Sequence, residues 1–160
     1  MRYFFLLFAL GVLLVSCDRD DFQQIRLADQ TVTKPADGIG HYVFAATLPH
    51  TVTPGITLPL AMEWRTIGPV DPTARYALTI LLAGPTQKTY RYAPSNNTVG
   101  EYHLSNWQTY NLKIPADFPA GTYTVAVGIE STEGESIVLG FQPDLLLRDG
   151  FYRIAEVGVE

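Results

Sequence analysis

Aromatic and amide side chains are concentrated between positions 90 and 110 of this 160-residue chain. The aromatic residues are Tyr90, Tyr92, Tyr102, Trp107 and Tyr110, and the amides among them are Asn96, Asn97, Asn106 and Gln108. A flat ring covers the apolar face of a pyranose while neighbouring amides bond its hydroxyls, and the same residue types serve protein interfaces. These five aromatic residues are therefore our candidate ligand-binding set. The alternative is that Trp107 and Tyr110 fill or cover the core of the domain.

The sequence contains none of the common catalytic motifs. It lacks a Gly-x-Ser-x-Gly elbow, a His-Glu-x-x-His pair and a phosphate-binding glycine loop. The three histidines do not have the spacing of metal ligands: His41, His50 and His103. Carboxylates that could form a glycosidase pair lie mostly beside glycine or proline, as solvated turn charges do. We therefore expect no catalytic residue, no metal site and no cofactor.

The single cysteine follows an export-type leader. Met1-Arg2 precedes an apolar run from Tyr3 to Val15, which is followed by Ser16-Cys17 and a charged segment. A helix of that run rises only about 20 Å, less than the roughly 30 Å of a bilayer's hydrocarbon core. The layout therefore predicts a secretory signal over residues 1–16 rather than a membrane-spanning anchor.

The stretch Leu14-Val15-Ser16-Cys17 resembles the lipobox of bacterial lipoproteins. That resemblance implies that Cys17 is acylated with fatty acids such as palmitate and becomes the mature N-terminus. Two or more acyl chains hold a protein on a membrane almost permanently, so the resemblance implies a membrane as the first partner. The alternative is a plain signal peptide that ends near a chance cysteine. With one cysteine in the chain, no internal disulfide is possible.

Three aspartates follow Cys17 at positions 18, 20 and 21. Aspartate at this place resembles an inner-membrane retention signal in some bacteria and a surface-export signal in others, and it also suits a solvated tether. We favour surface export, which predicts a location in the cell envelope, at the outer membrane or cell surface. The net charge of −5 becomes −5 − 1 = −6 without Arg2, with no basic patch, so nucleic acid is excluded as a partner.

Alternation of apolar residues predicts short strands after Gly40. Ile56, Leu58, Leu60, Met62 and Trp64 would all fall on one face of an extended strand. Pro59 within it indicates an edge or a bulge. The other predicted strands are His41 to Leu48, Arg75 to Ala83 as a central strand, Lys88 to Ala93, Thr109 to Pro115, Thr122 to Glu130, Ser136 to Phe141 and Phe151 to Val159.

These strands predict an all-β domain, an antiparallel sandwich of about seven to nine strands. We expect a signal peptide over residues 1–16, an acidic tether and linker with at most one edge strand over residues 17–37, and the sandwich over residues 38–160. Amphipathic helices of useful length are not predicted.

The segment from Trp107 to Ile129 carries a second resemblance. Trp107, Leu112-Lys113-Ile114-Pro115 and the turn Pro119-Ala120-Gly121-Thr122-Tyr123 resemble immunoglobulin-like or fibronectin-type modules. Such modules are accessory domains of bacterial carbohydrate-active enzymes and membrane glycosyltransferases. The resemblance implies that Tyr123 begins a late strand near a corner of the sandwich, but a fold of this kind does not specify a function.

Together these features predict a lipid-anchored envelope protein with a non-catalytic, immunoglobulin-like binding module. The first hypothesis is a protein partner within an envelope assembly, and the alternative is a carbohydrate-binding surface lipoprotein. An open edge strand or exposed apolar patch would indicate a protein partner. A shallow aromatic groove surrounded by amides would indicate a glycan.

Overall fold

The computed structural model of the chain describes residues 21–34, 40–68, 75–92 and 106–160. In these residues the strands are β1 (Phe22–Arg26), β2 (Gly40–Pro49), β3 (Thr51–Val52), β4 (Thr57–Ile67), β5 (Ala77–Ala83), β6 (Gln87–Tyr92), β7 (Asn106–Lys113), β8 (Gly121–Glu130), β9 (Ser136–Ile137), β10 (Leu146–Arg148) and β11 (Phe151–Val159). Two short 3-10 helices, η2 (Ala28–Gln30) and η4 (Pro143–Leu145), complete the elements.

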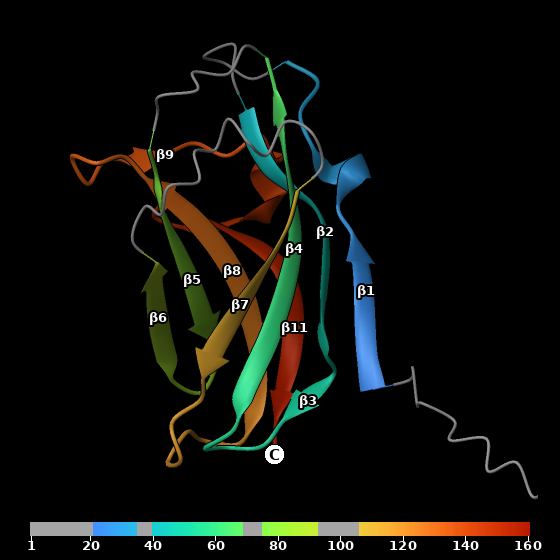
Figure 1. Ribbon diagram of the computed structural model, residues 1–160, viewed down its shortest axis with the longest axis vertical. Coiled ribbons are helices and arrows are strands. Elements are labelled where there is room, and N and C mark those ends of the chain that lie inside the picture. Colours follow the sequence, from blue (N-terminus) through green and yellow to red (C-terminus); the bar gives the residue numbers. More distant parts are fainter. Residues whose placement is uncertain (1–20, 35–39, 69–74, 93–105) are drawn as a thin grey trace, which may run out of the picture.

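The strands form two facing sheets. The first sheet has the order β1-β2-β4-β7, and the second has the order β10-β11-β8-β5-β6, with β3 beside β11 and β9 beside β8. Figure 1 shows β4 and β7 in front of β5, β8 and β11, with β1 and β6 at opposite borders. The predicted all-β sandwich is confirmed. Eleven strands are described, more than the predicted seven to nine, because β3, β9 and β10 are short strands of two or three residues. One pair of strands departs from the antiparallel arrangement, since β3 is parallel to β11.

The interior between the sheets is filled by alternate residues of the long strands. Leu58, Leu60, Met62 and Trp64 of β4 are buried as predicted, but Ile56 is 58% exposed because it lies in the bend before β4. Pro59 lies where β4 pairs only with β7, because the pairing of β4 with β2 begins at Ala61. The absent N–H of Pro59 therefore interrupts no ladder.

Tyr123 anchors the start of β8 in the core. Its side chain is fully buried, its hydroxyl donates to the carbonyl of Pro119 over 2.8 Å, and its ring stacks on Phe118 at 4.7 Å between centroids. Gly121, the first residue of β8, has a φ of +146°, and a Cβ there would lie 2.7 Å from the ring of Pro85. The start of β8 thus needs glycine both for its conformation and for its close packing.

The folded domain begins earlier than residue 38, so the predicted boundary of the linker is corrected. The single edge strand allowed for in residues 17–37 is β1, and it pairs with β2 over five positions. Ile25 packs against the core and Leu27 is 3% exposed within it, so burial holds this segment to the sandwich. Residues 1–20, including Cys17, lie outside the described residues. No helix in the described part of the chain is long and apolar enough to cross a membrane.

Candidate functional site

The candidate aromatic residues come from two neighbouring edge strands. Tyr90 and Tyr92 lie on β6, whereas Trp107 and Tyr110 lie on β7. Tyr102 lies outside the described residues. The structure brings the three described tyrosines together and leaves Trp107 on a different face.

The tyrosines close one side of the sandwich. The hydroxyl of Tyr90 donates to the carbonyl of Lys113 over 2.9 Å, and that of Tyr92 donates to the carbonyl of Asn111 over 3.2 Å. The rings of Tyr92 and Tyr110 meet edge to face with centroids 5.1 Å apart. These contacts join an edge strand of one sheet to an edge strand of the other. We call this region, formed by β6 and β7, the closed side.

The closed side favours neutral tyrosine hydroxyls. Burial raises the pKa of Tyr90 to about 12, and the neighbouring Tyr92 adds to that rise. Burial also raises the pKa of Tyr92. Both hydroxyls are therefore donors at neutral pH, already engaged within the molecule. For these residues the geometry favours the structural alternative over ligand binding.

Trp107 differs from the tyrosines because its side chain is 50% exposed. It lies opposite Glu63 in the register of β4 and β7, on the outer face of the four-stranded sheet. Glu63 is only 5% exposed, and its Oε1 accepts from Nε and Nη2 of Arg65 at 2.9 and 2.6 Å. A half-exposed indole opposite a partly buried ion pair is a polar and aromatic surface feature.

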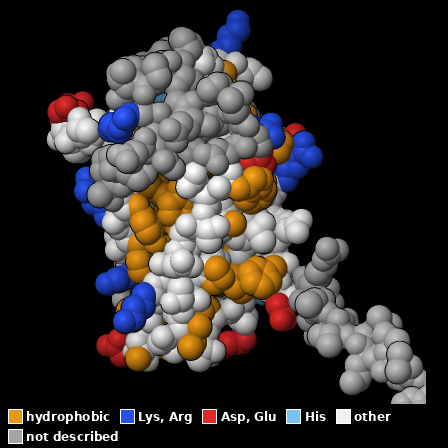
Figure 2. Space-filling view, in the orientation of Figure 1, with side chains coloured by type: hydrophobic (Ala, Val, Ile, Leu, Met, Phe, Trp, Pro, Cys, Tyr) orange, Lys and Arg blue, Asp and Glu red, His pale blue; other side chains and the backbone are white. Residues whose placement is uncertain are grey.

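The same outer face continues across β2 to β1. The guanidinium of Arg65 lies 3.4 Å from the centre of the Phe44 ring, and that of Arg26 lies 5.1 Å from it. Such contacts hold guanidinium groups through the negative face of the ring. Figure 2 shows hydrophobic side chains spread over this sheet, with most charged side chains at its margins. Arg26, Phe44 and Arg65 could not be singled out from the sequence, because only the strand register brings them together.

The opposite side of the sandwich is open. A groove of about 330 Å³ lies there between β1 and β11. Its lining includes Gln23 and Ile25 of β1, Leu27 just after β1, and residues 153–156 of β11. Gln23 spans the groove, because its Nε2 donates to the carbonyl of Glu156 over 2.6 Å. We call this region, formed by β1, β10 and β11, the open side.

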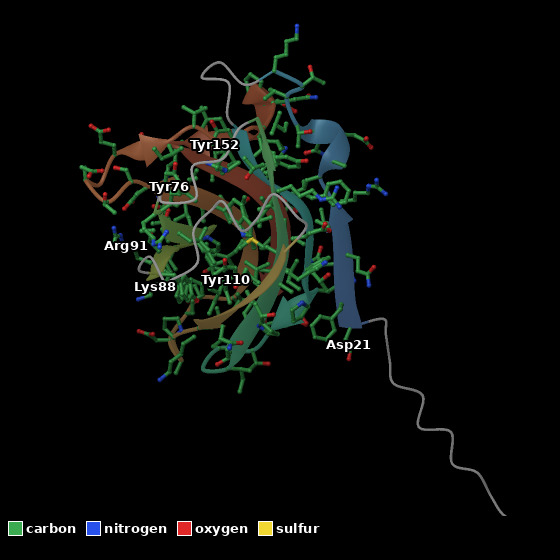
Figure 3. The ribbon with its side chains drawn as sticks, turned by 45° about the horizontal axis from the view of Figure 1, so that its top comes forward. Asp21, Tyr76, Lys88, Arg91, Tyr110 and Tyr152 are labelled. Atoms are coloured by element: carbon green, nitrogen blue, oxygen red, sulfur yellow. The ribbon has the colours of Figure 1, made fainter. Side chains whose placement is uncertain are left out.

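Large apolar side chains are exposed on the open side. Phe22 of β1 is 46% exposed, and Leu146 and Leu147 of β10 are 47% and 42% exposed. Figure 3 shows Asp21, at the start of β1, across the molecule from Lys88 and Arg91 of β6. The alternation of Phe22, Gln24 and Arg26 with inward residues is a strand signal that could have located β1 from the sequence, although it is only five residues long.

The described residues hold no cluster of three or more histidine, cysteine or acidic side chains that could bind a metal. His41 is buried on β2, where its Nδ1 lies 2.9 Å from Oγ1 of Thr66 and its ring lies 5.3 Å from that of Tyr76. Burial lowers the pKa of His41 to about 4, so the ring is neutral at neutral pH. His50 is exposed, and His103 lies outside the described residues.

No protein-family model matches the chain, and no curated protein sequence matches it. Function is therefore inferred from the residues and from the contrast between the closed and open sides.

Proposed function

We propose that this chain is a lipid-anchored protein of the bacterial cell envelope whose non-catalytic β-sandwich binds a protein partner. The lipobox resemblance at Leu14 to Cys17 supports an anchor on Cys17, and the aspartates that follow support a location at the outer membrane or cell surface. The immunoglobulin-like resemblance of residues 107–129 supports a binding module rather than an enzyme. The lipid would hold the sandwich beside the membrane, where envelope assemblies form.

The open side is the observation that carries the proposal of a protein partner. An unpaired edge strand offers backbone donors and acceptors to an incoming chain, and exposed apolar side chains beside it offer burial. Phe22 precedes the groove-lining Gln23, and Leu146 and Leu147 follow the groove-lining Leu145, so these exposed residues provide such side chains. The closed side offers less, since its tyrosine hydroxyls already bond the carbonyls of β7.

A carbohydrate ligand is the second candidate function, and Trp107 is the observation that favours it. A half-exposed indole can cover one face of a sugar ring, and the nearby Glu63–Arg65 pair offers polar contacts. Binding on a polysaccharide array that is lost in Trp107→Ala and kept in Phe22→Ala would support this function. The reverse pattern, or no array signal, would leave the protein partner as the function.

The protein-partner proposal is tested by an affinity pull-down of the lipidated chain from mild-detergent extracts of its own membranes. We expect a stoichiometric protein partner that is lost from a Phe22→Ser, Leu147→Ser double variant. A Trp107→Ser variant is the matched control, because it also replaces an exposed apolar side chain but lies away from the open side. Equal recovery of the partner with all three chains would contradict the proposal.

The anchor is tested separately with Cys17→Ser. We expect the variant to leave the membrane fraction while its melting transition is unchanged, since Cys17 precedes the folded domain that begins at Phe22. Fractionation of membranes and a thermal melt measure the two effects. A cleaved variant that remains membrane-bound would show that the lipid is not what holds the protein.

A further inference from the structure

The free edge of β1 has a defined set of unpaired backbone groups. Leu27 N donates to Phe44 O over 2.9 Å, and Asp21 O accepts from His50 N over 3.0 Å. In an antiparallel pair, alternate residues direct both backbone groups toward the partner and the residues between direct both away. The N–H and C=O groups of Phe22, Gln24 and Arg26 therefore point away from β2, and no described strand pairs with them. Figure 1 shows β1 at the border of its sheet.

The other long edges in the described part of the chain are protected against strand addition. Edge strand β6 carries the exposed cations Lys88 and Arg91. Edge strand β7 has the carbonyls of Asn111 and Lys113 occupied by tyrosine hydroxyls. By contrast, β1 contains no proline and no break in its register, and its one charged side chain, Arg26, lies over the Phe44 ring at the last position of the strand. Charges, prolines and bulges are the usual devices that block edge pairing, and β1 carries only this single charge among them.

We propose that a second copy of this chain pairs with this edge, β1 antiparallel to β1, about a two-fold axis at Gln24. The unpaired residues are symmetric about Gln24, so each free N–H at positions 22, 24 and 26 meets a free C=O of the other copy. None of these backbone groups is left over. The pairing joins the two four-stranded sheets into one continuous sheet, the isologous contact that a two-fold axis requires.

The outward side chains suit this register. Phe22 of one copy lies opposite Arg26 of the other, and Gln24 lies opposite its equivalent. Arg26 already lies 5.1 Å from the centre of its own Phe44 ring, so a second aromatic ring would sandwich the guanidinium. A register centred on Arg26, or a parallel pairing in register, would place two arginines side by side, which is unfavourable. The residue types therefore favour the two-fold arrangement over its alternatives.

This inference rests on the proposed function, since it names a second copy as the protein that the open side binds. A single pair of five-residue strands is a small interface, so we expect a reversible dimer in solution. Anchoring by lipid would confine copies to one membrane surface and raise their effective concentration.

Disulfide trapping tests the register. Residues that form a hydrogen-bonded antiparallel pair have Cα atoms about 5.5 Å apart, within the range that a disulfide spans. We expect the full-length Gln24→Cys chain in its own membranes to give a cross-linked dimer as the main product of mild oxidation. Thr89→Cys, at an exposed position of edge strand β6, is the matched control and should give only traces. The unchanged chain controls for Cys17.

A proline variant tests the edge without disturbing the fold. Gln24→Pro removes an N–H that points away from β2, so the bonds of β1 to β2 remain. We expect the detergent-solubilised full-length chain to show concentration-dependent dimers by sedimentation velocity, and Gln24→Pro to be a monomer with an unchanged melting transition. Ile25→Pro removes a β1–β2 bond and should instead lower the melting temperature.

Two results would overturn the self-pairing: a chain that sediments as a monomer at every concentration, or Gln24→Cys trapping no greater than that of Thr89→Cys. The proposed function is then judged by a different readout. One outcome is that the unchanged chain is a monomer and Gln24→Pro abolishes the capture of another protein in the pull-down. The edge then binds a strand of that other protein, and only the proposed occupant is wrong. If the capture is unaffected, the assignment of the binding site to the open side is wrong as well.

Discussion

The two sides of the sandwich use their sheet edges in opposite ways. On the closed side, Tyr90 and Tyr92 reach from one sheet to bond backbone carbonyls at the edge of the other. On the open side, Gln23 alone among the side chains of β1 bonds the backbone of the second sheet, and the edge of β1 is left without a partner. One side therefore uses its polar groups to hold the two sheets together. The other side leaves the backbone groups at the edge of β1 available to a second molecule.

The tyrosines of the closed side and Phe22 of the open side also differ in exposure. Tyr90, Tyr92 and Tyr110 are half-buried against the core, where large rings stabilise the fold. Phe22, by contrast, is 46% exposed at the open border. An exposed ring contributes little to folding, so Phe22 is available for the contact proposed at the edge of β1.

The largest expected effect comes from the core that both sides share. Tyr123→Ala should lower the free energy of unfolding by about 3–5 kcal/mol, because it removes a fully buried ring together with its bond to Pro119. Urea unfolding measures this. An unchanged midpoint would mean that Tyr123 is not part of the core.

Truncating one aromatic residue on each side tests whether the two sides contribute differently to the free energy of unfolding. Tyr92→Ala on the closed side should cost about 2–4 kcal/mol of unfolding free energy, whereas Phe22→Ala on the open side should cost less than about 0.5 kcal/mol. Tyr92→Phe isolates the hydroxyl, which should contribute about 0.5–1.5 kcal/mol. Equal losses for Tyr92→Ala and Phe22→Ala in urea unfolding would remove the distinction between the sides.

The closed side should also open at alkaline pH. Burial raises the pKa of Tyr90 to about 12 from its ordinary value near 10, so folding favours the neutral form. Its contribution to stability is complete below pH 10 and is lost as the pH rises through 12. Unfolding midpoints measured between pH 9 and 12 should fall, and Tyr90→Phe should flatten that decline. A decline of the same size in Tyr90→Phe would assign it to another group.

A second pH effect, at acidic pH, belongs to neither side. Burial lowers the pKa of His41 to about 4, so the unfolded chain binds a proton near pH 6.5 that the folded chain does not. The contribution of His41 is complete above pH 6.5 and is lost as the pH falls toward 4. Comparison of His41→Gln with the unchanged chain between pH 4 and 7 should show a shallower loss of stability in the variant. Identical curves would exclude His41 as the titrating group.

Much of the fold could be predicted from apolar alternation. The buried residues of β4 and β8 and the central position of β5 follow from spacing alone. Ile56 was misassigned because a bend after Gly55, with φ of +84°, interrupts the period just before β4 begins. The boundary at residue 38 was wrong because β1 is short and polar on one face, and its pairing with β2 is a long-range contact that local patterns do not specify.

The candidate site was predictable by residue type but not by role. Trp107 and Tyr110 are three positions apart, so a strand must direct them to opposite faces, and only Tyr110 is in step with Leu112 and Ile114. The bonds of Tyr90 and Tyr92 to β7 depend on how the two sheets face each other. The open side depends on strand order, which decides that β1 has one neighbour rather than two.

The central claim is that the open side, and not the closed side, binds the protein partner. Photo-cross-linking in intact cells tests it most directly, with a photoreactive amino acid placed at Phe22 on the open side or at Thr89 on the closed side. We expect a discrete cross-linked protein from position 22 and none from position 89. Cross-linking from position 89 alone would contradict it.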